Sequence, residues 1–326
     1  MFDKTKRQIN YLRISITDHC NLRCQYCLPE KDTNFSENYN LLSPNEIEKI
    51  VKAFSLIGIK KVRITGGEPL IRNDFLNILK KINKIEGIEK IALTTNGYNL
   101  LENLDTFEKN GLKRINISLD SLNPEKYKMI TRKGDFHKIF NTIKIASTKK
   151  FEKIRINVVI MKGINDNEIL DFVNLTKDLN ICVRFIEVMP IGEGKKFASL
   201  ENSEVLSLIK ESYPLEKSDT SSTDGPASYY KVPNFLGEVG FISPLSNNFC
   251  ETCNRVRVTS NGFLKLCLHY KDGIDLIPYL KDNVSVEELA KIIEEAIYNK
   301  KPKEHQMNHT ECIENVDLKT MNTIGG

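Results

Sequence analysis

Short apolar runs rich in β-branched residues alternate with amphipathic segments over the first 190 residues, and this alternation constrains the fold more than any other feature. Strand–helix alternation predicts a parallel sheet, and six such units are enough for an α/β fold built as an incomplete (β/α)6 TIM-type barrel. The predicted strands are residues 11–17, 61–67, 90–97, 114–120, 154–163 and 182–190. The predicted helices between them are residues 43–58, 74–85, 99–110, 135–149 and 166–180.

The helix predicted over 43–58 has the clearest boundaries. Ser43 is a favourable N-cap, Pro44 occupies the first helical position, and Glu46 lies three residues after the cap. These residues form the capping-box pattern, and Gly58 provides a stop. The pattern predicts a helix that begins directly after Ser43.

Polar or glycine-rich residues follow five of the predicted strands. They read TGGEP (65–69), TTNG (94–97), SLD (118–120), MKG (161–163) and EVMP (187–190). Turns also use Gly, Asn, Asp and Pro, which accounts comfortably for one or two such sequences but poorly for five in succession. In a parallel barrel these positions are the carboxyl ends of the strands, where active sites are built. We therefore expect an active site at this end.

The pattern changes beyond residue 195. A loop rich in Ser, Thr, Gly and Pro at 218–230 marks a boundary, which predicts a barrel domain over 1–217 and a C-terminal extension over 218–326. In the extension, residues 231–243 and 254–268 resemble short antiparallel strands, and a helix is predicted near 285–298.

Composition and charge exclude several classes of protein. The chain is 40% hydrophobic, and its net charge of +4 is too small to indicate nucleic-acid binding. The N-terminus has no apolar segment typical of a signal peptide, and no apolar run is long enough to span a membrane. We expect a cytoplasmic protein, in which the eight cysteines favour metal or redox chemistry over disulfides.

Three cysteines, Cys20, Cys24 and Cys27, follow the first predicted strand with the spacing C-x3-C-x2-C. Clustered thiolates bind zinc or iron–sulfur clusters. Structural zinc takes four ligands, and the nearby His19 is adjacent to Cys20 and badly placed to complete a tetrahedron. Three thiolates on a four-iron cluster leave one iron available to a small molecule. The spacing favours iron–sulfur and leaves zinc open.

A second triplet lies in the extension, where Cys250 and Cys253 form C-x2-C and Cys267 follows. With His269 this triplet would also make a Cys3His zinc site, and spacing alone does not exclude that reading. The remaining two cysteines, Cys182 and Cys312, stand alone and are interpreted as small buried hydrophobic residues.

The first triplet, with Tyr26 before its last cysteine and GGEP (66–69) after the second strand, resembles the signature of radical S-adenosylmethionine enzymes. LTTNG, NISLDSL, MKGINDNEI, RFIEVMPIG, the second triplet and a terminal Gly-Gly extend the likeness over the whole chain. Together they resemble the GTP 3′,8-cyclase family of molybdenum-cofactor biosynthesis.

The resemblance implies two 4Fe–4S clusters, with S-adenosylmethionine as a cofactor and GTP as the substrate. The first cluster would chelate S-adenosylmethionine and supply the electron that forms a 5′-deoxyadenosyl radical. That radical would take the ribose 3′ hydrogen of GTP, and the resulting carbon radical would attack C8 of guanine, held by the second cluster. Reduction and protonation of the cyclised radical would then give (8S)-3′,8-cyclo-7,8-dihydroguanosine 5′-triphosphate, the first intermediate of molybdopterin biosynthesis.

The resemblance also assigns roles to individual residues. Five of the residues assigned to the substrate are arginines, which suit a triphosphate because a guanidinium is a permanently charged, bidentate donor. The cluster ligands would be Cys20, Cys24, Cys27, Cys250, Cys253 and Cys267. S-adenosylmethionine would contact Tyr26, Gly67, Ser118 and Met189. GTP would contact Arg13, Arg63, Thr94, Arg155, Arg255, Val256 and Arg257. The residues with catalytic roles would be Arg255, Arg257, Gly325 and Gly326.

Two positions depart from the family pattern. Arg155 stands where the family typically has Lys, and the tail reads LKTM where the family often has an Arg before the Met. The implied partners are an electron donor of the flavodoxin or ferredoxin type and a downstream cyclic pyranopterin monophosphate synthase. The resemblance also allows a homodimer.

Two alternatives remain at this point. One is another two-cluster radical S-adenosylmethionine enzyme, such as a peptide maturase, although its substrate would not need five arginines. The other is a non-catalytic zinc protein that binds nucleic acid, which would need a basic surface with exposed aromatic residues. The near balance of charge and the lack of Trp disfavour this second alternative.

Overall fold

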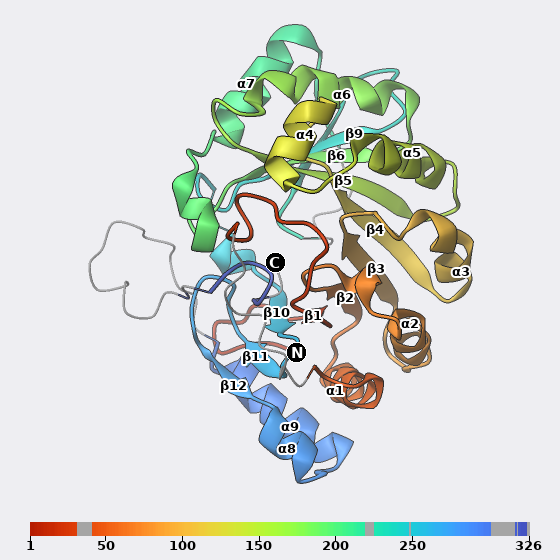
Figure 1. The fold of residues 1–326 in the computed structure, drawn as a ribbon. Helices are drawn as coiled ribbons and strands as arrows, with labels where there is room; N and C mark the ends of the chain where they lie inside the picture. Colours follow the sequence, from red (N-terminus) through yellow and green to blue (C-terminus); the bar gives the residue numbers. More distant parts are fainter. Residues whose placement is uncertain (31–40, 219–224, 248, 301–316, 318, 325–326) are drawn as a thin grey trace.

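The computed structural model describes residues 1–30, 41–218, 225–247, 249–300, 317 and 319–324. The described strands form a single curved sheet in the order β12-β11-β10-β1-β2-β3-β4-β5-β6-β9-β8-β7. The strands from β10 through β1–β6 to β9 all pair in parallel. Helices cover the outside of this curved sheet, so the predicted partial barrel is confirmed (Figure 1).

All six predicted barrel strands are present, and each ends two or three residues before the end of its predicted run. Polar residues at the end of each predicted run lie beyond the strand and form the loops that lead to the next helix. The strands are β1 (Tyr11–Ser15), β2 (Lys61–Thr65), β3 (Lys90–Thr95), β4 (Leu112–Ser118), β5 (Lys153–Ile160) and β6 (Cys182–Glu187).

The predicted helices are also present, and the predicted start of the first is confirmed. Ser43 and Glu46 make both hydrogen bonds of the capping box. These helices are α1 (Pro44–Leu56), α2 (Phe75–Asn83), α3 (Leu104–Lys109), α5 (Phe136–Ser147) and α6 (Ile169–Asp178). Three further helices, α4 (Pro124–Thr131), α7 (Asn202–Ser212) and α8 (Ile277–Lys281), were not predicted. The start of α4 has a sequence signal, because Asn123 caps it and Pro124 follows.

The extension lengthens both edges of the barrel sheet. β7 (Glu216–Lys217) directly precedes it, and its elements are β8 (Ser228–Lys231), β9 (Glu238–Ile242), β10 (Arg255–Val258), β11 (Phe263–Lys265), β12 (Gly273–Asp275), α8 (Ile277–Lys281) and α9 (Val286–Tyr298). Antiparallel pairing is correct for β7–β8–β9 and β10–β11–β12. The prediction of antiparallel strands is wrong at the two junctions with the barrel, because β9 pairs in parallel with β6 and β10 pairs in parallel with β1. These pairings provide hydrogen-bond partners for the backbone N–H and C=O groups at the two edges of the barrel sheet. Such long-range pairing is not encoded in the local sequence.

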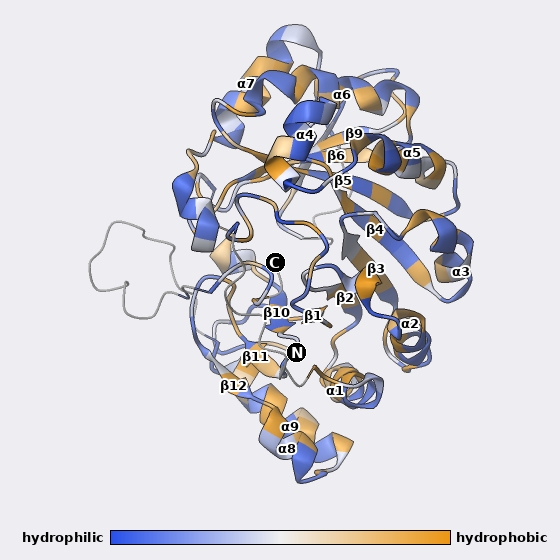
Figure 2. Cartoon of the chain, viewed as in Figure 1, coloured by the Kyte–Doolittle hydropathy of each residue, from blue (hydrophilic) through white to orange (hydrophobic). Residues whose placement is uncertain are grey.

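Hydrophobic and hydrophilic residues form bands along the strands (Figure 2), and successive side chains of a strand point to opposite faces of the sheet. In β1, Leu12 and Ile14 are fully buried in the hydrophobic core beneath the helices. Tyr11 and Arg13, which alternate with Leu12 and Ile14, face the inside of the barrel, where they line a cavity. Among the described residues, no helix is long and apolar enough to cross a membrane.

Candidate active site

A cavity of about 350 Å³ occupies the end of the barrel formed by the strand ends and the extension. It brings together residues from the two halves of the chain that the sequence predicted as one site. The predicted residues that line it are Arg13, Cys20, Cys24, Tyr26, Cys27, Arg63, Gly67, Thr94, Ser118, Met189, Cys250, Cys253, Arg255, Arg257 and Cys267.

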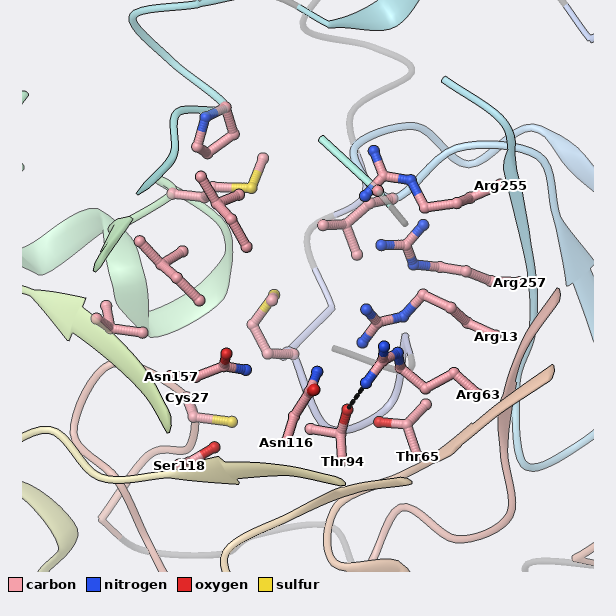
Figure 3. A pocket seen from close by; sticks show the side chains of 18 of the residues that line it. Arg13, Cys27, Arg63, Thr65, Thr94, Asn116, Ser118, Asn157, Arg255 and Arg257 are labelled. Atoms are coloured by element: carbon pink, nitrogen blue, oxygen red, sulfur yellow. Dashed lines mark hydrogen bonds between the residues drawn. The ribbon is translucent and has the colours of Figure 1, made fainter. Parts of the chain in front are cut away.

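Three arginines lie side by side on neighbouring strands. Strand register places Arg13 of β1 opposite both Arg257 of β10 and Arg63 of β2. With Arg255 they form a ladder of four guanidinium groups along one wall of the cavity (Figure 3). Cys27 lies on the opposite side of this view. We call Arg13, Arg63, Arg255 and Arg257 the arginine ladder.

The arginine ladder places several positive charges close together in a buried setting. Burial and the neighbouring Arg257 and Arg63 hold the pKa of Arg13 well below its usual range. Burial and Arg255 lower the pKa of Arg257 to about 10. The Nε atoms of Arg255 and Arg257 are buried without a hydrogen-bond partner among the described residues. Such a concentration of positive charge is costly unless an anion binds there.

The two acidic residues that line the cavity do not neutralise this charge. Among the described residues that line the cavity, seven are Arg or Lys and two, Asp120 and Glu187, are acidic. Asp120 accepts hydrogen bonds from the Tyr26 hydroxyl at 2.8 Å and the backbone N–H of Val159 at 2.9 Å. Glu187 accepts hydrogen bonds from the loop at 245–246 and from the N–H of Asn202. The cavity is therefore suited to a polyanion.

The loop that carries the first cysteine triplet rests on the glycine turn after β2. The N–H of Gly67 donates to the Thr17 carbonyl at 2.8 Å, and the N–H of Glu68 donates to the His19 carbonyl at 2.7 Å. A Cβ atom on Gly67 would lie 2.2 Å from the His19 carbonyl oxygen. Glycine is therefore required at this position by the close packing of the cysteine loop, independently of any ligand.

Replacing Gly67 with Ala should displace this loop and reduce iron incorporation at the first triplet. Overpacking of this kind costs roughly 1–3 kcal/mol. The matched control is Gly163→Ala, where an added Cβ meets nothing within 4 Å but the φ of +76° causes strain of about 1–2 kcal/mol. Thermal unfolding and iron analysis should show a similar loss of stability in both variants but a loss of iron in Gly67→Ala alone. Normal iron content in Gly67→Ala would contradict this role.

Buried carboxylates connect the ends of neighbouring strands. Glu68 accepts hydrogen bonds from Thr95 Oγ1 at 2.7 Å and the Asn96 N–H at 2.6 Å, which joins the loops after β2 and β3. Burial raises the pKa of Glu68 to about 7 and that of Asp120 to about 6. Through its bond to Tyr26, Asp120 fixes the cysteine loop to the end of β4.

Helix α4 supports the other side of the same loop. The N–H groups of Arg23 and Gln25 donate to the carbonyls of Thr131 and Ile130 at the end of α4. The side chain of Arg132 then donates to the Arg23 carbonyl at 3.0 Å. Because α4 was not predicted from the sequence, this support for the first triplet was missed.

The thiols of the first triplet need a bound cation to remain ionised. Burial raises the pKa of Cys20 to about 11 and that of Cys27 to about 12, and it also raises the pKa of Cys24. Thiolates are the form that binds metal, so metal binding would release protons here. The three thiols line one end of the cavity and match the donor set of an iron–sulfur cluster.

The thiols of the second triplet differ from one another: burial raises the pKa of Cys250 to about 11, whereas Cys253 has a more positive environment. Burial raises the pKa of the Cys253 thiol, but the charges of Arg255 and Lys300 outweigh this effect and lower that pKa to about 6. Cys250, Cys253 and Cys267 all line the cavity, whereas His269, the fourth ligand of the zinc reading, is not among the lining residues. The donor set that faces the cavity is three thiols, which fits a second cluster with one open iron.

The described part of the tail reaches the cavity. Met321 and Asn322 line it, and the side chain of Asn322 donates to the Asp18 carbonyl at 2.8 Å beside the first cysteine loop. Ile324 is fully buried. Gly325 and Gly326 lie outside the described residues, so their predicted role is a proposal.

Two predicted substrate contacts are placed differently from the others. The side chain of Val256 is buried in the hydrophobic core, so any contact with a ligand would come from its backbone. Arg155 is buried in register with Asn116 but is not among the residues that line the cavity. The flanking Arg255 and Arg257 do face the cavity, as alternation along a strand requires.

Several polar lining residues were missed by the sequence analysis. Asn116 Oδ1 is buried without a hydrogen-bond partner among the described residues, and Asn157 Oδ1 accepts from Arg184 Nε at 3.0 Å. In Figure 3 the Asn116 side chain lies between Cys27 and the arginine ladder. The sequence did contain a signal for Asn116: it lies two residues before Ser118 in the predicted strand, so both side chains point to the same face. Arg7 and Lys300, which also line the cavity, had no comparable signal.

Comparisons with known proteins agree with this geometry. A family model for the radical SAM superfamily matches residues 14–176, and one for Molybdenum Cofactor Synthesis C matches residues 181–307. A GTP 3′,8-cyclase of Clostridium perfringens (strain 13 / Type A) is 47% identical, with 100% of both chains covered. A GTP 3′,8-cyclase of Desulforamulus reducens is 44% identical, again over 100% of both chains.

Among solved structures, Streptococcus suis SuiB bound to S-adenosylmethionine matches with a TM-score of 0.60. The match covers 94% of this chain and 71% of that chain at 16% identity, so it supports the fold alone. Fold, cysteine loop and family models together define a radical S-adenosylmethionine enzyme, which uses S-adenosylmethionine and an iron–sulfur cluster. Within that class, the chain belongs to the GTP 3′,8-cyclase family.

Proposed function

We propose that this enzyme converts GTP to (8S)-3′,8-cyclo-7,8-dihydroguanosine 5′-triphosphate, the first step of molybdopterin biosynthesis. The observation that carries the proposal is the arginine ladder in the same cavity as both cysteine triplets. The buried, unpaired Nε atoms of Arg255 and Arg257 suit a triphosphate better than a peptide. The likeness to GTP 3′,8-cyclases over the full chain supports the same substrate.

We assign one 4Fe–4S cluster to each triplet. Cys20, Cys24 and Cys27 would hold the cluster that, when reduced, supplies the electron that cleaves S-adenosylmethionine to a 5′-deoxyadenosyl radical. The second cluster, on Cys250, Cys253 and Cys267, would hold the guanine base.

The residues between these two ends would orient the reactants. Tyr26, Gly67, Ser118 and Met189 would form the S-adenosylmethionine end, close to the first triplet. The arginine ladder would bind the phosphates, and Thr94, which accepts a hydrogen bond from Arg63 at 3.3 Å, would fix the position of that guanidinium. The ribose of GTP would then lie between the two ends, where correct placement contributes most to the rate.

Further parts of the proposal rest on the sequence and the family. They are the division into 1–217 and 218–326, a cytoplasmic location, an electron donor of the flavodoxin or ferredoxin type, and a cyclic pyranopterin monophosphate synthase acting downstream. Roles for Arg155, for the Val256 backbone and for Gly325 and Gly326 belong here as well. A homodimer is compatible with these assignments.

Anaerobic turnover tests the proposed activity. The reconstituted enzyme should form 5′-deoxyadenosine and the cyclic nucleotide in equal amounts when GTP, S-adenosylmethionine and a reductant are present. Replacement of GTP by ATP should leave only slow, uncoupled cleavage of S-adenosylmethionine. Absence of the cyclic nucleotide with GTP would contradict the proposed activity, and equal product formation with ATP would contradict the preference for guanine.

Replacing Arg257 with Ala should weaken GTP binding roughly ten- to hundredfold, because loss of one charge-assisted contact costs about 1.5–3 kcal/mol. Iron content should remain normal, since Arg257 is not a cluster ligand. The matched control is Arg114→Ala, because Arg114 lies near the start of β4 and pairs with Glu152 at 3.1 Å instead of facing the cavity. Calorimetric titration should show unchanged affinity in the control. Unchanged affinity in Arg257→Ala would place the phosphates elsewhere.

A further inference from the structure

Lys300 lies just after α9, and its side chain reaches the second cysteine triplet. The residue is 4% exposed and lines the cavity. Its Nζ donates to the Arg255 carbonyl and lies 3.8 Å from Cys253 Sγ. Among the described residues, no carboxylate pairs with this ammonium group. Its charge is therefore directed at the cysteine and at the cavity.

The N-terminal segment holds Lys300 in this position. Arg7 Nη2 donates to the Lys300 carbonyl at 2.9 Å, and Arg7 Nη1 donates to the Cys250 carbonyl at 2.8 Å. Asp3 neutralises Arg7 through an ion pair of 2.6 Å in which both side chains are buried. The N-terminal segment thus fixes the backbone at Cys250 and at Lys300, and Asp3 pairs with Arg7 instead of with the lysine.

The two triplets differ in the donors that approach their sulfur atoms. Cys253 Sγ has two cationic neighbours, Lys300 at 3.8 Å and Arg255 at 3.9 Å. In the first triplet, the donors to Cys20 Sγ are neutral, namely the Leu22 N–H at 3.4 Å and the Asn96 amide at 3.9 Å. Hydrogen bonds and positive charge at cluster sulfur atoms favour the reduced, more negative state of a cluster.

We propose that Lys300 is a positioning residue for the second cluster and raises its reduction potential through the contact with Cys253. This inference rests on the proposed second cluster and extends it to a residue that is not a ligand. The ammonium group stabilises the reduced cluster because the added electron increases the negative charge on the thiolate sulfur. Arg7 acts on the same cluster indirectly, since it holds the Lys300 backbone.

The test uses full-length protein in which Cys20, Cys24 and Cys27 are replaced by Ala, so that only the second cluster is present. In this parent, Lys300→Met should favour the oxidised cluster at least tenfold, which is a shift of about 59 mV to more negative potential for one electron. Redox titration followed by electron paramagnetic resonance measures the shift. Lys291→Met, an exposed position on α9, is the matched control and should not change the potential.

Two further variants separate charge from structure. Lys300→Gln keeps a hydrogen-bond donor but removes the charge, so an intermediate shift is expected, and Lys300→Arg should stay close to the parent. An unchanged potential in Lys300→Met with a full cluster would overturn the inference. Loss of the cluster in both Lys300→Met and Lys300→Gln would assign the lysine a purely structural role and would also overturn it. Absence of iron from the parent itself would instead contradict the second cluster, and the inference with it.

Discussion

Replacing Cys24 with Ala should abolish cleavage of S-adenosylmethionine, whereas replacing Cys253 with Ala should leave one cluster and at most uncoupled cleavage. Cys24 belongs to the triplet that lines the cavity together with Tyr26 and Ser118, so its loss removes the proposed source of the radical. Cys253 belongs to the triplet beside the arginine ladder, so its loss removes the proposed site for the guanine base. Chromatographic assay of 5′-deoxyadenosine and of the cyclic nucleotide distinguishes the two results.

The chain offers a matched control for these cysteine replacements. Cys182 is fully buried in β6 and is not among the residues that line the cavity. Cys182→Ala should therefore lower stability by about 1 kcal/mol and leave both clusters and turnover in place. Coupled product formation by Cys253→Ala at the rate of the unmodified enzyme would show that the second triplet has no part in the reaction.

Removing Gly325 and Gly326 should nearly abolish cyclisation while iron content and GTP affinity stay close to normal. These glycines lie outside the described residues, but the residues just before them reach the cavity at Met321 and Asn322. Glycine has no Cβ and allows a close approach of backbone to ligand. We expect the truncation to disturb the placement of the reactants more than their binding.

A product assay beside a GTP-binding measurement tests the truncation. Gly325→Ala and Gly326→Ala together serve as the comparison, since they keep the length of the chain but add two methyl groups. Activity in that variant would show that the length of the tail matters more than its lack of side chains. Full turnover by the truncated enzyme would show that the two glycines are dispensable.

Local patterns in the sequence were sufficient to predict the barrel. Ser43 and Glu46 defined the start of α1, and each buried apolar run became a strand. The parallel pairing of β9 and β10 with the barrel edges could not be predicted this way, because it depends on contacts between segments far apart in the chain. Helix α4 was missed although Asn123 and Pro124 gave a start signal.

The candidate site shows the same division. Cysteine spacing indicated both triplets, the family resemblance assigned the four arginines of the arginine ladder, and the structure places all of them around one cavity. Asp120 was seen only as a strand end, and its bond to Tyr26 required the structure. Lys300 and Arg7 could not be recognised, because the N-terminal segment meets the end of α9 only in the folded chain. Their sequence contexts are those of ordinary surface cations.

Metal analysis of anaerobically purified and reconstituted enzyme tests the central claim most directly. Two three-cysteine sites on one cavity should each hold a four-iron cluster, so the account predicts about eight irons and about eight sulfides per chain, with little zinc. Replacement of all three cysteines of either triplet should halve both values. Stoichiometric zinc in place of iron at either triplet would contradict the account.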